Sequence, residues 1–544
     1  MERRTLLTAA AGALTATTAT ACSGGSGGSG THGADGVDGK STPDRTGASP
    51  SAGTGGTAAA SGSARPVGAA AWNALGKGLD GELVRPDDAA YATARQLYNT
   101  RFDDLKPAAI AYVSGEDDIR ECLAFARSGG VPVSIRGGGH SYAGWSSGNG
   151  RLVIDVSRLD AIDRAGPDAV IGAGARLGDV YRTLARRGRT IPAGSCPTVG
   201  IAGLTLGGGH GVVSRAYGLT CDNLLSATLV TADGKRLTAD SERHADLFWA
   251  LRGAGNGNFG VVTELRFRTH PAPEAVTAFA SWPWSKAETL VRAWQAWGPE
   301  QPDEIWSSLH LSAGPGGVAP TVSLSAFSLG GETELKNALD RLADGPGGPG
   351  SARSVSVRRR GYEEAMRLFG GCSGLSDEQC RLPGTTPGRS PRGALRRETY
   401  AGTSDFYDRS LTPAGVRALV SATEEFTRLP AYRGGGGSVI LTALGGAINR
   451  TDPAATAFVH RRARLLAQYI ASWQPGTSGT AHQDWLKNAH TSMRRHASGR
   501  AYQNYTDPKL SDWRSSYYGT AADRLTRLKR RYDPDRLFDF PQAL

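Results

Sequence analysis

Three glycine-rich segments, at residues 134–144, 193–211 and 251–260, are the feature that most constrains the fold of this chain. Glycine is frequent throughout, at 74 of 544 residues, but these clusters adjoin short apolar runs instead of lying in a low-complexity tract. Glycine adopts positive φ angles and lets the backbone approach a ligand or another backbone closely. The sequence therefore predicts several strand-to-loop junctions with unusually close backbone packing.

The first cluster follows an apolar run at residues 131–136 that predicts a strand. Successive N–H groups in a glycine loop form a nest for phosphate oxygens, and an arginine before the loop adds charge complementarity. A glycine run alone would be a surface turn, and a histidine alone a core residue. In this order they favour a dinucleotide site, whose candidate residues are Arg136, Gly137, Gly138, Gly139, His140, Ser141 and Tyr142.

The second cluster joins a cysteine to two glycine runs. Its backbone suits close contact with a flat ring, whereas Cys196 taken alone would more often be a buried structural thiol. The candidate ligand-binding residues here are Cys196, Val199, Gly200, Gly203, Gly207, Gly208, Gly209 and His210.

The third cluster matches the G-x-G-x-x-G pattern through Gly255, Gly257 and Gly260. A Rossmann dinucleotide site would need a helix next. Residues 261–268 instead contain β-branched residues and strand-like alternation. The sequence therefore predicts a loop that leads into a strand, with Gly260 and Val262 as binding candidates, and rejects the Rossmann fold.

A fourth segment, residues 501–507, contains Tyr502, Asn504 and Tyr505. A tyrosine can act as a general base when its environment lowers its pKa; core packing is the structural alternative. The ten histidines form no H-E-x-x-H or C-x-x-C…H pattern, so no metal site is predicted. The G-x-S-x-G match at residues 24–28 lies in a low-complexity stretch, where no hydrolase elbow can form.

The N-terminus has the layout of an export signal. Arg3 and Arg4 precede a weakly apolar run that ends at Cys22, which predicts a twin-arginine-type lipoprotein signal over residues 1–22, with plain cleavage as the alternative. Residues 23–66 predict a flexible Gly/Ser/Thr tether. We expect an exported protein, either a cell-surface lipoprotein or secreted, whose one membrane contact is a lipid on Cys22.

The remaining residues predict two α+β units. Residues 67–272 alternate short strands (109–113, 131–136, 152–156, 227–231 and 260–269) with helices (117–127 and 177–187). Residues 273–495 contain strands 321–328 and 438–444 and helices 287–298 and 412–428, which suits an antiparallel sheet. A basic amphipathic helix is predicted at residues 521–533. Cys372 and Cys380 are expected to form a local disulfide, because an exported protein matures in an oxidising compartment.

The net charge of +11 suits a basic surface without a dedicated partner, or attraction to acidic envelope polymers. No interleaved basic and aromatic module points to nucleic acid.

Taken together, the motifs resemble the berberine bridge enzyme-like oxidases, within the vanillyl-alcohol oxidase or p-cresol methylhydroxylase flavoprotein superfamily. The resemblance covers residues 105–540. It rests on the motifs at 136–142, 196–200, 207–211, 217–223, 246–253, 502–505 and 532–538. It implies an FAD-binding p-cresol methylhydroxylase-type domain at 67–272, a substrate domain at 273–495 and a C-terminal berberine-bridge-type segment at 496–544 that returns to the FAD domain.

The resemblance also implies roles for individual residues. His140 would bind the flavin 8α-methyl and Cys196 the flavin C6, so that FAD is held by two covalent bonds. Tyr502 would be the base that takes a hydroxyl proton while hydride passes to the flavin. Tyr142 would lie near the flavin face, and Asn504 would contact the flavin. Val199 matches the small residue of relatives that react with molecular oxygen.

One position departs from the family pattern. Related enzymes project an acid or a phenol from the strand that matches residues 438–444, where this chain offers Thr442 and Leu444, and Tyr469 or Gln468 could substitute as the partner of Tyr502. We therefore expect an oxidase of a hydroxylated small molecule: a sugar, an alcohol or a secondary metabolite. A dehydrogenase with another electron acceptor and a flavin-binding module without turnover are the alternatives.

Overall fold

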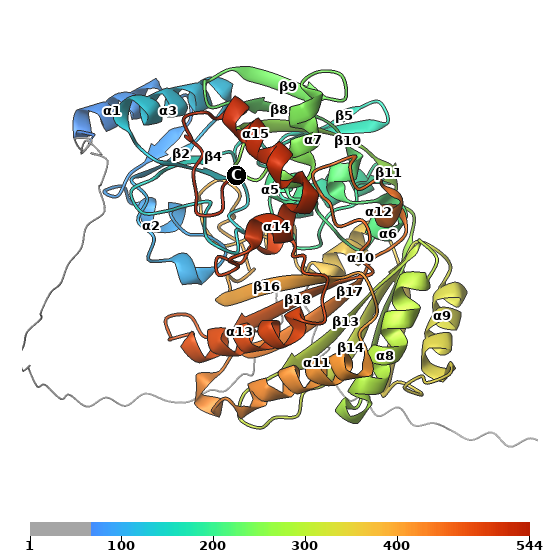
Figure 1. The fold of residues 1–544 in the computed structure, drawn as a ribbon. Coiled ribbons are helices and arrows are strands. Elements are labelled where there is room, and N and C mark those ends of the chain that lie inside the picture. Colours follow the sequence, from blue (N-terminus) through green and yellow to red (C-terminus); the bar gives the residue numbers. More distant parts are fainter. Residues whose placement is uncertain (1–66) are drawn as a thin grey trace, which may run out of the picture.

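The computed structural model describes residues 67–544, which form two sheet-based units around a shared central region (Figure 1). The N-terminal unit begins with a four-stranded sheet in the order β1 (Glu82–Val84), β2 (Ala109–Tyr112), β4 (Leu152–Asp155) and β3 (Val133–Arg136). Strands β2, β4 and β3 run parallel, and β1 pairs antiparallel with β2. The helices of this part of the chain are α1 (Ala69–Gly78), α2 (Tyr91–Ala94) and α3 (Glu116–Gly129).

A second, antiparallel sheet completes the N-terminal unit. Its strand order is β5 (Ile162–Ala165), β6 (Asp168–Gly172), β10 (Val261–Arg268), β8 (Leu224–Val230) and β9 (Arg236–Asp240). The helices between these strands are α4 (Leu177–Ala185), α5 (Ile201–Leu206), α6 (Ser214–Tyr217) and α7 (Ala245–Ala254), and β7 (Arg189–Thr190) pairs with β11 (His270–Pro271). The glycine clusters lie in the loops and short helices of this unit.

The second unit is built on a seven-stranded antiparallel sheet. Its strand order is β15 (Ser354–Arg360), β12 (Ala275–Trp282), β14 (Thr321–Ser328), β13 (Ile305–Ala313), β17 (Gly436–Ala443), β18 (Leu465–Ser472) and β16 (Tyr400–Tyr407). One face of the sheet packs a hydrophobic core against α8 (Ala287–Trp297), α9 (Glu332–Asp344), α11 (Pro413–Glu425) and α13 (Thr480–Arg494) (Figure 1). The opposite face is left for contact with the N-terminal unit.

The last residues of the chain return to the N-terminal unit. Helices α14 (Trp513–Tyr518) and α15 (Ala522–Tyr532) lie beside its sheets (Figure 1). Leu525, Leu528 and Phe538 belong to the same buried cluster as residues of β2, β4 and β10. The Lys529 ammonium is buried among the carboxylate of Asp533 and the backbone oxygens of Asn258 and Phe538. The C-terminus is therefore part of the N-terminal core.

The α+β fold predicted from the sequence is confirmed. Every strand and helix predicted by residue range is present, with ends shifted by a few residues; residues 321–328 match β14 without any shift. The strand predicted after the third glycine cluster is β10, so the rejection of a Rossmann site is also confirmed. The remaining short helices are α10 (Tyr362–Phe369) and α12 (Ala447–Arg450).

The predicted disulfide between Cys372 and Cys380 is present, and Cys122 and Cys221 are buried and unpaired. Closing so short a loop removes denatured-state entropy worth about 2–3 kcal/mol in the chain-entropy model. We expect Cys380→Ser to lower the melting temperature by a few degrees and to leave the bound flavin spectrum unchanged. Differential scanning calorimetry beside absorbance spectroscopy would measure both; an unchanged melting temperature would contradict the stabilising role.

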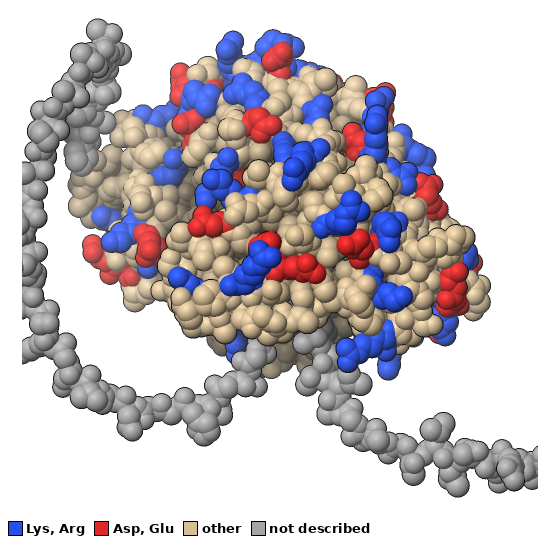
Figure 2. Space-filling model, turned by 60° about the horizontal axis from the view of Figure 1, so that its bottom comes forward, with Lys and Arg blue, Asp and Glu red and all other residues tan. Residues whose placement is uncertain are grey.

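The predicted export signal and tether lie outside the described residues. Within residues 67–544, no helix is long and apolar enough to cross a membrane. On the face shown in Figure 2, basic and acidic side chains are interspersed and form no patch of one sign.

Candidate active site

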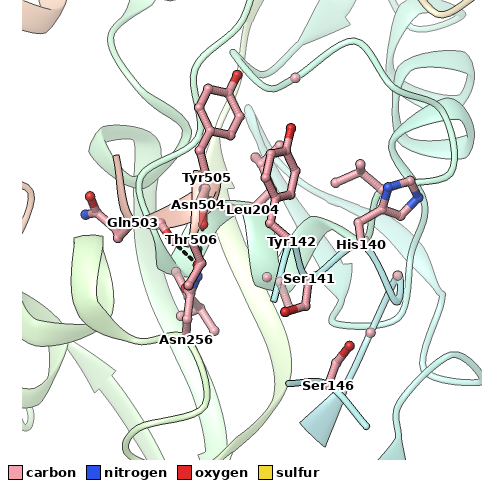
Figure 3. A pocket seen from close by; sticks show the side chains of 18 of the residues that line it. His140, Ser141, Tyr142, Ser146, Leu204, Asn256, Gln503, Asn504, Tyr505 and Thr506 are labelled. Atoms are coloured by element: carbon pink, nitrogen blue, oxygen red, sulfur yellow. Dashed lines mark hydrogen bonds between the residues drawn. The ribbon is translucent and has the colours of Figure 1, made fainter. Parts of the chain in front are cut away.

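A cavity lies between the glycine loops, the open face of the seven-stranded sheet and the C-terminal segment. Its volume is about 370 Å³, within the range of roughly 300–1,000 Å³ that is typical of small-molecule and cofactor sites. His140, Ser141, Tyr142, Asn504 and Tyr505 surround it in Figure 3. Residues from both units and from the C-terminus therefore share one site.

The first two glycine clusters line this cavity and touch each other. A β-carbon at Gly138 would lie 2.2 Å from the Gly200 nitrogen, and one at Gly200 would lie 2.4 Å from the Gly138 nitrogen. Gly139 has a φ of +70°, in the left-handed region. A β-carbon at Gly203 would meet no atom within 4 Å. The glycines thus hold two loops back to back and leave open space for a ligand on the cavity side.

His140 and Cys196 lie far apart in sequence, but both side chains are close to the same hydroxyl group, that of Thr198. The Thr198 Oγ1 lies 2.9 Å from His140 Nε2 and 3.8 Å from Cys196 Sγ. Tyr98 stacks on the imidazole, with 4.1 Å between ring centroids. Burial, reinforced by the nearby charge of Arg176, lowers the pKa of His140 to about 3. The imidazole is therefore neutral at physiological pH, which is the form that can act as a nucleophile.

Tyr502 lines the cavity from the position directly before a short 3₁₀ helix, Gln503–Tyr505. The Gly209 backbone N–H and the Asn504 side-chain amide each donate a hydrogen bond to this oxygen, both at 2.9 Å. Burial raises the pKa of Tyr502, and the two donors act in the opposite direction. Because two donors occupy the oxygen as an acceptor, its own O–H is available to a ligand in the cavity.

Two further tyrosines form a stacked pair beside Tyr502. The rings of Tyr142 and Tyr505 are 5.2 Å apart and nearly parallel. Gln468 Nε2 donates a hydrogen bond of 2.6 Å to the Tyr142 hydroxyl, and His210 Nε2 lies 2.8 Å from the Tyr505 hydroxyl. Burial lowers the pKa of His210 to about 4, so this imidazole is also neutral. Both phenols are therefore held in fixed positions by neutral partners.

The sheet contributes a neutral polar wall. Along β13, Trp306, Ser308 and His310 alternate toward the cavity, and Ser308 Oγ lies 2.9 Å from His310 Nε2. Ser325 and Thr442 line the same wall from the neighbouring strands β14 and β17. Two acidic or basic residues line the cavity, Arg151 and Asp539, and neither belongs to the seven-stranded sheet.

Several buried polar side-chain atoms that line the cavity have no hydrogen-bond partner within the described residues. Among the residues that the structure describes, Ser146 Oγ, Asn256 Oδ1 and Gln542 Oε1 line it without a hydrogen-bond partner. Figure 3 shows Ser146 and Asn256 at separate places along the site. Unpaired buried polar groups of this kind are costly unless a ligand or water satisfies them. Together with the glycine cradle and the neutral histidine, they fit a long, partly polar group such as FAD.

Most of the predicted site residues line the cavity: Gly137, Gly138, Gly139, His140, Ser141, Tyr142, Cys196, Val199, Gly200, Gly203, His210, Gly260, Val262, Tyr502 and Asn504. Gly207, Gly208 and Gly209 do not line the cavity, and their contact with a cofactor stays a prediction. A β-carbon at those positions would collide with Asn504, Phe458 and Thr220 respectively. Close packing of these neighbouring side chains therefore requires glycine at all three positions.

The side chains of two other candidates, Arg136 and Tyr469, lie away from the cavity. The Arg136 guanidinium does not face the cavity; its Nε is hydrogen-bonded to Asp155 in a buried ion pair. Tyr469 lies on the helix-covered face of the sheet, where its hydroxyl is 2.7 Å from that of Tyr407. Its neighbour Gln468 faces the cavity, because successive residues of a strand point to opposite faces.

This fold and this cavity define a flavin-binding oxidoreductase, and comparisons with known proteins agree. Residues 107–240 match the family model for the FAD binding domain, and residues 501–544 match the model described as berberine and berberine like. The chain is 34% identical over 472 residues to the uncharacterised FAD-linked oxidoreductase YgaK of Bacillus subtilis, covering 86% of this chain and 97% of that protein.

Two further relatives have more specific names. The chitooligosaccharide oxidase of Gibberella zeae is 30% identical over 467 residues, covering 82% of this chain and 89% of that protein. The solved structure of Physcomitrella patens BBE-like 1 superposes with a TM-score of 0.77 at 30% identity, covering 87% of this chain and 98% of that one. The chain belongs to the berberine bridge enzyme-like family of FAD-linked oxidoreductases.

Several site residues were missed from the sequence. Ser308 and His310 form a period-two pattern that could have indicated a cavity-facing strand. Thr198 lies inside the cysteine motif, but only the structure shows that it joins His140 to Cys196. Tyr505 belonged to a recognised motif without an assigned role, and its contact with His210 spans 295 positions of sequence.

Proposed function

We propose that this protein is an oxidase that removes a hydride from a hydroxyl-bearing carbon of a neutral, polyhydroxylated substrate such as a sugar or an oligosaccharide. The observation that carries the proposal is the placement of the Tyr502 hydroxyl in the same cavity as the neutral polar wall of Ser308, His310 and Thr442. FAD, when bound, would supply the two-electron acceptor and its reoxidation by molecular oxygen.

The chain's own residues would orient the substrate and move its proton. In its phenolate form Tyr502 would take the hydroxyl proton, since the Gly209 N–H and the Asn504 amide stabilise negative charge on the phenol oxygen. The sheet wall offers hydroxyl, imidazole and amide groups for hydrogen bonds, with Trp306 as an aromatic surface. Such a wall favours substrates with several hydroxyl groups, because analogues that lack them leave its polar groups unpaired.

The name of the Gibberella zeae relative supports the saccharide class. Val199 lines the cavity and supports reaction with oxygen through its match to oxidases of the family. The test is a panel of mono- and oligosaccharides and primary alcohols, read out as hydrogen peroxide and as flavin bleaching. Peroxide with saccharides supports the proposal. Bleaching that persists in air would indicate a dehydrogenase, and no bleaching with any substrate would indicate a non-catalytic flavin-binding protein.

We further propose that FAD is held by two covalent bonds, from a His140 ring nitrogen and from the Cys196 sulfur. The support is that both side chains line the cavity and approach the same Thr198 hydroxyl. Because His140 Nε2 is hydrogen-bonded to Thr198, Nδ1 is the nitrogen left for the bond.

Acid precipitation followed by peptide mass mapping tests the covalent attachment. We expect the flavin to remain in the pellet and to map to the peptides of both His140 and Cys196. His140→Ala and Cys196→Ala should each retain the flavin through the other residue, and the double variant should release it. His270→Ala is the matched control, because His270 is a half-buried histidine that does not line the cavity. Colour in the supernatant of the native protein would refute both bonds.

Export remains a proposal that rests on Arg3, Arg4 and Cys22, which lie outside the described residues. The Cys372–Cys380 disulfide supports it, because such bonds persist in oxidising compartments. Mass spectrometry of the mature N-terminus from cell envelopes would show whether the chain begins at a lipidated Cys22.

A further inference from the structure

A second, much smaller cavity of about 40 Å³ adjoins the first glycine loop. Gly137, Gly138 and Gly139 line it, together with the ends of β3 and β4, the start of α4 and the loop at residues 382–389. Its charged residues are Arg136, Asp155, Arg176 and Arg389. None of these four side chains lines the cofactor cavity. The two spaces share a loop but not their charged groups.

The charges in this small cavity do not balance. Asp155 is paired with Arg136, and their side chains are 3% and 5% exposed. Arg176 Nη2 donates 2.9 Å to the Ser157 hydroxyl, and Arg389 Nη1 donates 3.0 Å to the Pro383 carbonyl oxygen. Both of these acceptors are neutral, and no other carboxylate lines the cavity among the described residues. An excess of two positive charges therefore remains in a largely buried place.

Two of the guanidinium groups also have nitrogens without a partner. Arg136 Nη1 and Arg176 Nη1 are buried and make no hydrogen bond within the part of the chain that the structure describes. Arg136 as a whole is only 4% exposed. An unpaired buried donor costs about 1–3 kcal/mol, and more when it is charged. The missing component is therefore an acceptor that carries negative charge.

The three arginines remain charged at neutral pH although they repel each other. Burial, followed by the neighbouring guanidinium groups of Arg397, Arg136 and Arg176, lowers the pKa of Arg389 only to about 10. Their field reaches the flavin loop, because the charge of Arg176 helps to lower the pKa of His140. Losing a proton thus does not relieve the charge excess at physiological pH.

We propose that this cavity binds a small inorganic anion, such as chloride, between Arg136, Arg176 and Arg389. Its volume exceeds the roughly 10–15 Å³ that one water needs but is far too small for a nucleotide. The anion would pair with the unsatisfied guanidinium nitrogens and neutralise part of the charge beneath the loop that carries His140. The charged groups of this site are separate from those of the larger cavity, which none of its arginines lines.

Bromide is the probe for this site. Crystals of the holoenzyme, with FAD in place, would be soaked in sodium bromide and examined by anomalous diffraction. In parallel, melting temperatures would be compared in sodium bromide and in sodium gluconate at equal ionic strength. We expect an anomalous peak between the three arginines and a saturable rise in melting temperature of about 2 °C or more, because an ion that binds the native state stabilises it.

Arg389→Gln should abolish both the peak and the bromide dependence of the melting temperature, and it retains a side chain that can reach the loop. Arg392→Gln is the matched control from the same loop, since Arg392 is 80% exposed and pairs with Glu378. No peak in the holoenzyme would overturn the proposal. A peak in the native protein would mean an adventitious ion only if its melting temperature did not depend on bromide, or if Arg389→Gln left that dependence unchanged. Either result would also overturn the proposal.

Discussion

Replacing Tyr502 with phenylalanine is expected to lower kcat/KM by about 10²- to 10⁴-fold, the usual contribution of a positioned general base, while FAD stays attached. The substitution removes one oxygen and keeps the ring, which packs in edge contacts with Phe406 and Phe458. The Gly209 N–H and the Asn504 amide then lose their shared acceptor. Steady-state kinetics with the best substrate, beside the flavin spectrum, would measure the effect.

The pH profile distinguishes proton transfer from a structural role of Tyr502. Since burial raises the pKa of Tyr502 above its ordinary value of 10.0, the phenolate is a minor species at neutral pH and its population grows as the pH increases. We therefore expect kcat/KM of the native enzyme to increase from neutral to alkaline pH and the Tyr502→Phe variant to lose this slope. A variant with the native slope and near-native kcat/KM would remove Tyr502 from the mechanism.

Tyr469→Phe is the matched control for this experiment. Tyr469 is equally a buried tyrosine, but it lies on the far face of the sheet and contacts Tyr407. Its substitution should leave kcat/KM within about threefold of the native value, because it removes no contact with substrate or cofactor. A loss as large as that of Tyr502→Phe would restore the sequence-based expectation that Tyr469 supports the base.

The face of the sheet on which Tyr469 lies could not be predicted from the sequence. Residues 465–471 read Leu-Leu-Ala-Gln-Tyr-Ile-Ala, and β18 is buried on both faces, so no alternation of polar and apolar residues reveals which face meets the cavity. The register with β16 and β17 decides it, and a shift of one residue would exchange Gln468 and Tyr469. That register is set by contacts with strands far away in sequence.

Local features were predicted well for the opposite reason. The glycine loops, the helix at 177–185 and the disulfide each depend on a few neighbouring residues. The Arg136 side chain was misplaced because Asp155 lies directly beside it only in the parallel register of β3 and β4. Thr442 was expected to point inward and does line the cavity, whereas Leu444 follows the end of β17 and packs near Phe458 and Tyr502.

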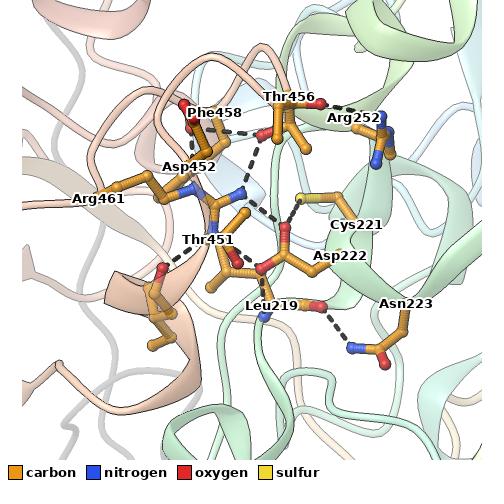
Figure 4. A network of polar contacts seen from close by, with 12 residues as sticks. Leu219, Cys221, Asp222, Asn223, Arg252, Thr451, Asp452, Thr456, Phe458 and Arg461 are labelled. Carbon is orange, nitrogen blue, oxygen red and sulfur yellow. Dashed lines mark hydrogen bonds and ion pairs between the residues drawn. The ribbon is translucent and has the colours of Figure 1, made fainter.

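Replacing Asp222 with asparagine is expected to cost about 3–5 kcal/mol of stability, the usual penalty for leaving a buried charge unpaired. Asp222 and Arg461 form a double hydrogen bond of 2.6 and 2.8 Å, with side chains 10% and 0% exposed. Figure 4 shows Arg461 directed at the Asp222 carboxylate, with Cys221 and Thr456 beside the pair. The Asp222→Asn substitution preserves shape and removes the charge.

The position of this ion pair explains why its loss should reach the active site. Asp222 follows the second glycine cluster, and Arg461 lies in the loop that precedes β18, so the pair joins the two units of the protein. Phe458, whose carbonyl oxygen accepts a hydrogen bond from Arg461, packs edge-on against the Tyr502 ring. Weakening the pair therefore loosens one support of the proposed base.

The melting temperature of the holoenzyme at a fixed scan rate measures the loss, for which we expect a drop of roughly 3–5 °C with Asp222→Asn. Glu425→Gln is the control: it breaks the exposed pair with Arg428, whose side chains are 45% and 76% exposed, and such surface pairs contribute about 0–1 kcal/mol. Equal melting temperatures of the two variants would mean that the buried Asp222–Arg461 pair contributes no more to stability than the exposed pair. If Asp222→Asn melts early and also lowers kcat with KM unchanged, the ion pair fixes the geometry of Tyr502 as well as the contact between the two units.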